Sequence, residues 1–95
     1  APDQDQLPPL EVGKGEAVVH GHVRRGSEGL PGAYVRLLDR TGEFTAEVPT
    51  SEAGTFRFFA APGEWTLRTL APGADTVDTK VTAAQGSVAE VAVAL

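Results

Sequence analysis

Hydrophobic and polar residues alternate along most of the chain after residue 15, and the alternation has a period of two. In "EAVVHGHVRR" (16–25), Ala17, Val19, Gly21 and Val23 fall on one side of an extended strand. Six further segments show this period, at 33–39, 43–50, 55–60, 64–70, 77–83 and 88–95, and Gly- or Pro-containing turns separate them. Seven short strands without a helical period predict an all-β fold, an antiparallel Greek-key β-sandwich.

The same alternation predicts which side chains face the core. Four of the five aromatic side chains in 43–68 are expected to point inward: Phe44, Phe56, Phe58 and Trp65. Residues expected to point outward are Tyr34, Arg36, Leu38, Arg57, Phe59 and Arg68. The aromatic-rich stretch is therefore interpreted mainly as core, with a smaller set of aromatic and Arg side chains on the surface.

Residues 1–12 differ from the rest of the chain. They are polar, contain three Pro and show no periodicity, so we expect a flexible N-terminal tail before a single β-sandwich domain at 13–95. Methionine is absent, including at position 1, and we expect that a short N-terminal segment precedes Ala1 in the primary product.

Composition narrows the classes of function. A net charge of −5 disfavours nucleic acid and anionic membrane surfaces as partners, since both need clustered Lys and Arg. No apolar run reaches about 18 residues, and no signal peptide is recognised. Cysteine is absent, which suits a reducing cytoplasm and excludes thiolate catalysis by this chain. We therefore expect a cytoplasmic location and no cofactor.

Four motifs carry a resemblance to a known class of module. "VHGHV" (19–23), "GLPGAYVRL" (29–37), "GTFRF" (54–58) and "APGEWTL" (61–67) together resemble carboxypeptidase regulatory-like, transthyretin-type sandwiches. More narrowly, "YVRLLDRTGEFTAEV" (34–48) and "FRFFAAPGEWTLR" (56–68) are similar to small actinobacterial SseC-like proteins, domain of unknown function 1416. The resemblance implies cytoplasmic sandwiches encoded beside thiosulfate sulfurtransferases, without an established catalytic residue set. Such proteins typically begin Met-Cys, and this chain lacks that Cys.

Five outward residues are candidates for a protein interface: Tyr34, Arg36, Arg57, Phe59 and Arg68. Aromatic and Arg side chains are the residue types enriched at protein–protein contacts. Their three strands must share one sheet if the side chains are to form one patch.

Metal binding and catalysis have weaker support. His20 and His22 lie two apart on one strand and can point to the same side, but a zinc site needs three or four protein ligands and no third is indicated. We interpret the carboxylates as solvated charges. The Ser residues fall in turns, and no His positioned by an acid is indicated that would complete a catalytic triad. No catalytic residue is predicted.

The sequence thus favours a small non-catalytic protein-interaction module, with a thiosulfate sulfurtransferase as the partner that the resemblance implies. One alternative is a small-ligand or carbohydrate-binding module that uses Tyr34 and Phe59 as stacking platforms. Another, also from the resemblance, is a sulfur carrier acting through an N-terminal Cys that this chain does not contain. The oligomeric state stays open.

Overall fold

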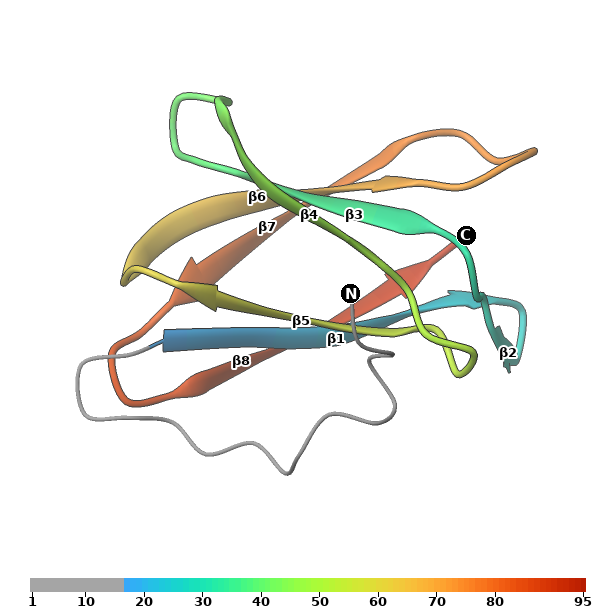
Figure 1. The fold of residues 1–95 in the computed structure, drawn as a ribbon, viewed down its shortest axis with the longest axis horizontal. Coiled ribbons are helices and arrows are strands. Elements are labelled where there is room, and N and C mark those ends of the chain that lie inside the picture. The colour runs from blue at the N-terminus through green and yellow to red at the C-terminus, as the bar shows by residue number, and fades with distance from the viewer. Residues whose placement is uncertain (1–16) are drawn as a thin grey trace.

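Two β-sheets packed face to face form the fold of residues 17–95, the part of the chain that the computed structural model describes (Figure 1). The strands are β1 (Ala17–Arg25), β2 (Glu28–Gly29), β3 (Tyr34–Leu38), β4 (Phe44–Pro49), β5 (Thr55–Ala60), β6 (Gly63–Leu70), β7 (Val77–Ala83) and β8 (Val88–Ala94). The predicted all-β sandwich is confirmed, and the two-residue β2 is an addition to the predicted strands. The predicted tail at 1–12 lies outside the described residues.

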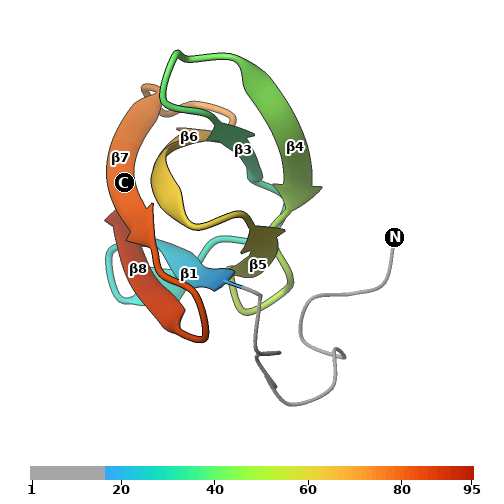
Figure 2. The ribbon, with the colours of Figure 1, turned by 90° about the vertical axis from the view of Figure 1, so that its left-hand side faces the viewer.

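The strand order places β1 and β3 at the centres of the two sheets. In the β1 sheet, β8 pairs with one edge of β1, and β5 and the short β2 pair with the other. The β3 sheet has the order β4-β3-β6-β7. Figure 2 shows the two sheets facing each other, with β7 beside β8. Because β6 returns beside β3 after β4 and β5, this part of the chain follows a Greek key.

One pairing departs from the predicted antiparallel arrangement. β1 and β8 run parallel, from Val18↔Val88 to Arg24↔Ala94. The reason is topological: the connection after β7 crosses from the β3 sheet to the β1 sheet, so β8 enters beside β1 in the same direction. The other pairings in residues 17–95 are antiparallel.

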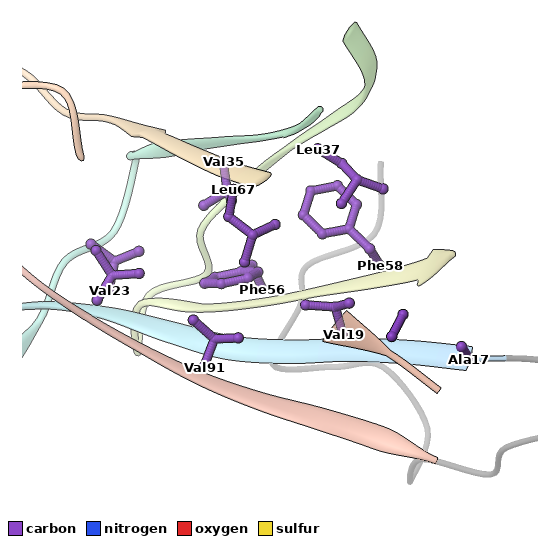
Figure 3. Close-up of a cluster of buried hydrophobic side chains, with 11 residues drawn as sticks. Ala17, Val19, Val23, Val35, Leu37, Phe56, Phe58, Leu67 and Val91 are labelled. Atoms are coloured by element: carbon purple, nitrogen blue, oxygen red, sulfur yellow. The ribbon is translucent and has the colours of Figure 1, made fainter. Parts of the chain in front are cut away.

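The core lies between the sheets and is centred on β5. Phe56 and Phe58 are buried as predicted, and their ring centroids are 6.1 Å apart at an angle of 60°. Figure 3 shows both rings pointing toward side chains of the opposite sheet, among them Leu37 and Leu67. On β1, Gly21 makes room for this packing, because an added Cβ would lie 2.6 Å from the Phe56 ring. That contact explains the glycine of the "VHGHV" motif.

A β-bulge reverses the predicted orientation of Phe44. The pairing runs Leu37↔Ala46 and then Leu38↔Phe44, so Thr45 is an extra residue on β4. Phe44 therefore points outward and is 61% exposed, where simple alternation had placed it in the core. Leu38 does lie on the outer face as predicted, but it is buried between its cross-strand neighbours on β4 and β6.

Trp65 points inward as predicted but is half-buried rather than enclosed. It packs against the edge of the core, and its indole Nε1 donates a hydrogen bond to the Ala61 carbonyl at 2.9 Å. The position at the rim of the sandwich leaves part of the indole accessible.

Candidate functional site

The outer face of the β3 sheet carries a row of four charged side chains across its strands: Glu47, Arg36, Arg68 and Asp78. Arg36 Nε donates to Glu47 Oε2 at 2.6 Å. Arg68 donates from Nε and Nη2 to the two oxygens of Asp78 at 2.9 and 3.0 Å. The hydrogen bonds between Arg68 and Asp78 lower the pKa of Asp78 and raise the pKa of Arg68. The two Arg side chains are thus held next to each other in the middle of the face.

Two exposed aromatic side chains lie on opposite sides of this charged row. Tyr34, on β3, is 50% exposed, and its cross-strand neighbours are Pro49 on β4 and Leu70 on β6. Phe44, on β4, is brought to the same face by the β-bulge. We call the surface of Tyr34, Arg36, Phe44 and Arg68 the Tyr34–Phe44 face.

The remaining interface candidates lie on the opposite side of the molecule. Arg57 and Phe59 belong to β5, which is in the β1 sheet, so the five predicted residues do not form one patch. The Arg57 guanidinium carbon is 6.0 Å from the centroid of the Phe59 ring, a cation–π contact. The same separation means that Tyr34 and Phe59 do not form a common stacking platform for a carbohydrate.

The two His candidates lie on the outer face of the β1 sheet. His20 Nδ1 is 3.0 Å from Glu90 Oε2, and the cross-strand neighbour on its other side is Arg57. His22 is flanked by Thr55 and Ala92, neither of which is a usual metal ligand. Within residues 17–95, no group of three or more His, Cys, Asp or Glu side chains is placed to hold a metal ion.

A groove that sequence reasoning did not identify lies at one end of the β3 sheet. One hollow of about 380 Å³ lies where the β3–β4 loop meets β6 and β7, lined by Arg40, Glu64, Trp65, Thr66, Lys80, Val81 and Thr82. A second hollow of about 420 Å³ is lined by Asp39, Arg40, Pro62, Gly63, Glu64 and Trp65. The two hollows share Arg40, Glu64 and Trp65, so we describe them together as the Arg40–Trp65 groove.

Hydrogen bonds fix the loop that carries Arg40. Asp39 Oδ1 accepts from Thr41 Oγ1 at 2.7 Å, from the Thr41 amide at 2.8 Å and from the Glu43 amide at 3.0 Å. The Thr41 hydroxyl, followed by the Glu43 amide, lowers the pKa of Asp39. Across the groove, Lys80 Nζ donates to Thr66 Oγ1 at 2.8 Å. The residues that line the groove therefore include two cations, Arg40 and Lys80, two carboxylates, Asp39 and Glu64, and Trp65.

The signals that could have revealed this groove were present but not distinctive. Lys80 occupies an outward position of the weakest predicted strand, and Arg40 lies in a turn. Trp65 was assigned to the core because it alternates with Leu67. The pairing of β6 with β7 brings Lys80 next to the Trp65 segment, and the path of the β3–β4 loop adds Arg40 to the same end of the sheet.

Fold and surface together define a small all-β sandwich module whose candidate binding groups lie on an outer sheet face and at a loop end. No helix within residues 17–95 is long and apolar enough to cross a membrane. The chain belongs to the family described as "Protein of unknown function (DUF1416)", whose model matches residues 1–95.

Relatives in actinobacteria share part of the chain. The uncharacterized protein Rv0814c of Mycobacterium tuberculosis is 59% identical over 56 residues, which make up 58% of this chain and 56% of that protein. An uncharacterized Mycolicibacterium smegmatis protein is 59% identical over 56 residues and 62% of its own length. The match thus spans less than two thirds of these relatives. The narrower SseC-like resemblance stays a prediction.

Two solved structures with the same fold are described as dioxygenases. The dioxygenase domain of a dioxygenase carbohydrate-binding protein fusion from Streptomyces sp. SirexAA-E has a TM-score of 0.67 at 15% identity, covering 99% of this chain and 96% of that chain. Catechol 1,2-dioxygenase from Acinetobacter sp. ADP1 has a TM-score of 0.57 at 17% identity, covering 84% of this chain and 38% of that chain. At such identities the likeness is one of fold alone.

Proposed function

We propose that this protein is a non-catalytic interaction module that docks another protein on its Tyr34–Phe44 face. The observation that carries the proposal is the arrangement of two exposed aromatic side chains on either side of two adjacent Arg side chains. Tyr, Phe and Arg are the residue types enriched at interfaces, and Tyr and Arg are frequent energetic hot spots.

The ion pairs of this face add support. Arg36 and Arg68 are already held by Glu47 and Asp78, so a partner that contacts them orders little additional side-chain freedom. The opposite face offers one exposed aromatic, Phe59, beside Arg57. The Tyr34–Phe44 face is therefore the better candidate of the two.

We further propose a thiosulfate sulfurtransferase as the partner, in the cytoplasm and in sulfur metabolism. This identification follows from the resemblance of residues 34–48 and 56–68 to SseC-like proteins, and the absence of cysteine agrees with a reducing setting.

The test is calorimetric titration of the sulfurtransferase with wild type and with a Tyr34→Ala/Phe44→Ala variant. Truncating a hot-spot aromatic costs about 2 kcal/mol or more, so we expect the variant to bind at least about thirtyfold more weakly. Phe59→Ala removes an equally exposed aromatic from the opposite face and is the matched control, expected to bind like wild type. Circular dichroism verifies that each variant is folded.

The outcomes separate the two parts of the proposal. Unchanged affinity of a folded Tyr34→Ala/Phe44→Ala variant would remove this face as the docking site. Absence of binding by wild type would remove the sulfurtransferase as the partner.

A further inference from the structure

We propose that the acidic, proline-containing segment 3–12 of this chain docks on the outer face of the β1 sheet. The segment lies outside the described residues, and the chain enters the described part at Ala17, the first residue of β1. The Tyr34–Phe44 face belongs to the other sheet, so the two surfaces are separate and the docking does not depend on a protein partner.

Apolar side chains mark the end of this face where the chain enters. Figure 3 shows Ala17 and Val19 directed into the core, so Val18 between them points outward. Its cross-strand neighbours on the same face are Phe59 on β5 and Val88 on β8. Phe59 is 60% exposed, and Val88 is half-buried. Adjoining apolar side chains on the outside of a sheet form a surface that a further segment can bury.

Beyond this apolar group the face is cationic. The outward positions of β1 and β5 carry His20, His22, Arg24 and Arg57. On β8 the outward positions carry one carboxylate, Glu90, which lies 3.0 Å from His20 Nδ1. With both His neutral, the two Arg exceed this carboxylate by one charge, in a chain whose net charge is −5. The outer face of the β1 sheet therefore favours an acidic occupant.

The N-terminal part of the chain has the opposite charge. Residues 1–16 contain a single Lys, Lys14, and four carboxylates, those of Asp3, Asp5, Glu11 and Glu16. Because this part is joined covalently to β1, it is held at high effective concentration beside the face. A separate protein would lose translational and rotational freedom on binding there. Charge and attachment together favour the chain's own segment as the occupant.

The middle of the segment, "LPPL" (7–10), has an apolar side that matches the apolar end of the face. Two consecutive Pro favour polyproline II, whose three residues per turn place Leu7 and Leu10 on the same side. Pro lacks an amide donor, so such a segment is poorly suited to extend a sheet edge and better suited to lie across a sheet face. Aromatic side chains such as Phe59 are the usual contacts of polyproline segments.

The length of the segment also matches the face. The residues "GKG" (13–15) precede β1, and glycine accepts the backbone conformations of tight turns, so the chain can reverse there and run antiparallel to β1. The seven steps from Val12 back to Asp5 span about 22 Å in polyproline II. The six steps of β1 from Val18 to Arg24 span about 20 Å. The segment therefore covers the face and brings Asp5 beside Arg24.

A spin label tests the docking in the full 95-residue chain. The chain has no Cys, so the Gln4→Cys variant carries a nitroxide at one defined position. The nitroxide broadens the amide NMR signals of residues close to it, and reduction with ascorbate gives the reference intensities. We expect a selective loss of signal at His22 and Ala92, on the outer face of the β1 sheet. Phe44, on the outer face of the other sheet, is expected to keep its signal.

Substitutions in the spin-labelled chain then identify the contacts. Leu7→Ser/Leu10→Ser removes the apolar side of the segment, and Phe59→Ala removes its contact on the face. Either change is expected to abolish the selective loss of signal at His22. Phe44→Ala removes an aromatic of nearly equal exposure from the other sheet, 61% against 60%, and is the matched control that should retain the loss. The amide signals of the core verify that each variant is folded.

Three results would overturn the proposal. The first is broadening spread evenly over both outer faces, and the second is a selective loss that persists in folded Phe59→Ala. The third comes from a mixture of isotope-labelled chain without nitroxide and unlabelled chain that carries it. Loss of signal at His22 in that mixture would assign the contact to a second copy of the chain instead of to the chain's own segment.

Discussion

At the scale of single residues, Thr50 holds the turn that leads into β3. Its buried Oγ1 accepts a hydrogen bond from the Ala33 amide at 3.0 Å and donates one to the Leu30 carbonyl at 2.7 Å. Thr50→Val keeps the shape of the side chain but leaves that amide and that carbonyl unpaired. We expect a loss of about 2 kcal/mol in the free energy of unfolding, the usual penalty for stranded buried polar groups.

Thr69 is the matched control, since the same substitution should act in the opposite direction there. Its Oγ1 is fully buried and has no hydrogen-bond partner among the described residues. Thr69→Val removes an unsatisfied hydroxyl from the core, and we expect a gain of about 1 kcal/mol. Urea unfolding of both variants measures the two effects, provided that the dependence of the unfolding free energy on urea concentration, the m value, stays that of wild type. A loss of stability in Thr69→Val would mean that the hydroxyl is satisfied in solution.

At the scale of strands and turns, Gly54 fixes the crossing from β4 to β5. Its carbonyl accepts from the Val23 amide at 2.7 Å, and its φ is +83°. A Cβ at this position would collide with the Val23 carbonyl oxygen and lie 2.7 Å from the Leu30 nitrogen. Gly54→Ala therefore meets both left-handed strain and backbone clash, and we expect a loss of about 3 kcal/mol or more.

Gly32 separates these two effects. Its φ is +72°, yet an added Cβ there meets nothing within 4 Å. Gly32→Ala should therefore cost only the conformational strain, about 1–2 kcal/mol. Thermal or denaturant unfolding compares the two variants directly. Equal losses would show that the crowding at Gly54 relaxes and does not determine the path of the chain.

At the scale of strands, the alternation of hydrophobic and polar residues predicted most side-chain orientations, but not the sheet to which each strand belongs. Alternation is a local property, so it correctly placed Phe56 and Phe58 in the core and Tyr34 and Phe59 on the surface. It failed at Phe44 because a bulge changes the register by one residue, and no residue of "EFTAEV" marks that bulge. Which sheet a strand joins is non-local, so the separation of Arg57 from Arg68 was outside the reach of the pattern.

At the scale of the whole molecule, the candidate site depends on the same long-range geometry. The Tyr34–Phe44 face needs both the strand order β4-β3-β6 and the bulge, and the groove needs the β3–β4 loop beside β6 and β7. Charge composition disfavours broad classes of partner but could not show that Arg40 and Lys80 lie near each other at one end of the β3 sheet. The fold was therefore more predictable than the surface that it creates.

The acid stability of the whole domain should depend on two carboxylates. Hydrogen bonds from Arg68 lower the pKa of Asp78, and those from Thr41 and Glu43 lower the pKa of Asp39, each below its ordinary value of 3.8. A carboxyl with a lowered folded-state pKa stabilises the fold above its unfolded pKa, and that contribution is lost as the pH falls through the folded value. Asp78 is exposed and Asp39 is half-buried, so solvent screens both carboxylates and the contribution is modest.

We therefore expect the melting temperature of wild type to be nearly constant from about pH 7 to 5 and to fall below about pH 4. In an Asp39→Asn/Asp78→Asn variant the amides do not titrate, so the fall should be shallower and the variant less stable than wild type at neutral pH. Asp75→Asn, at an exposed turn position, is the control and should follow the wild-type curve. A double variant whose melting curve runs parallel to wild type across the whole range would show that other carboxylates govern the acid transition.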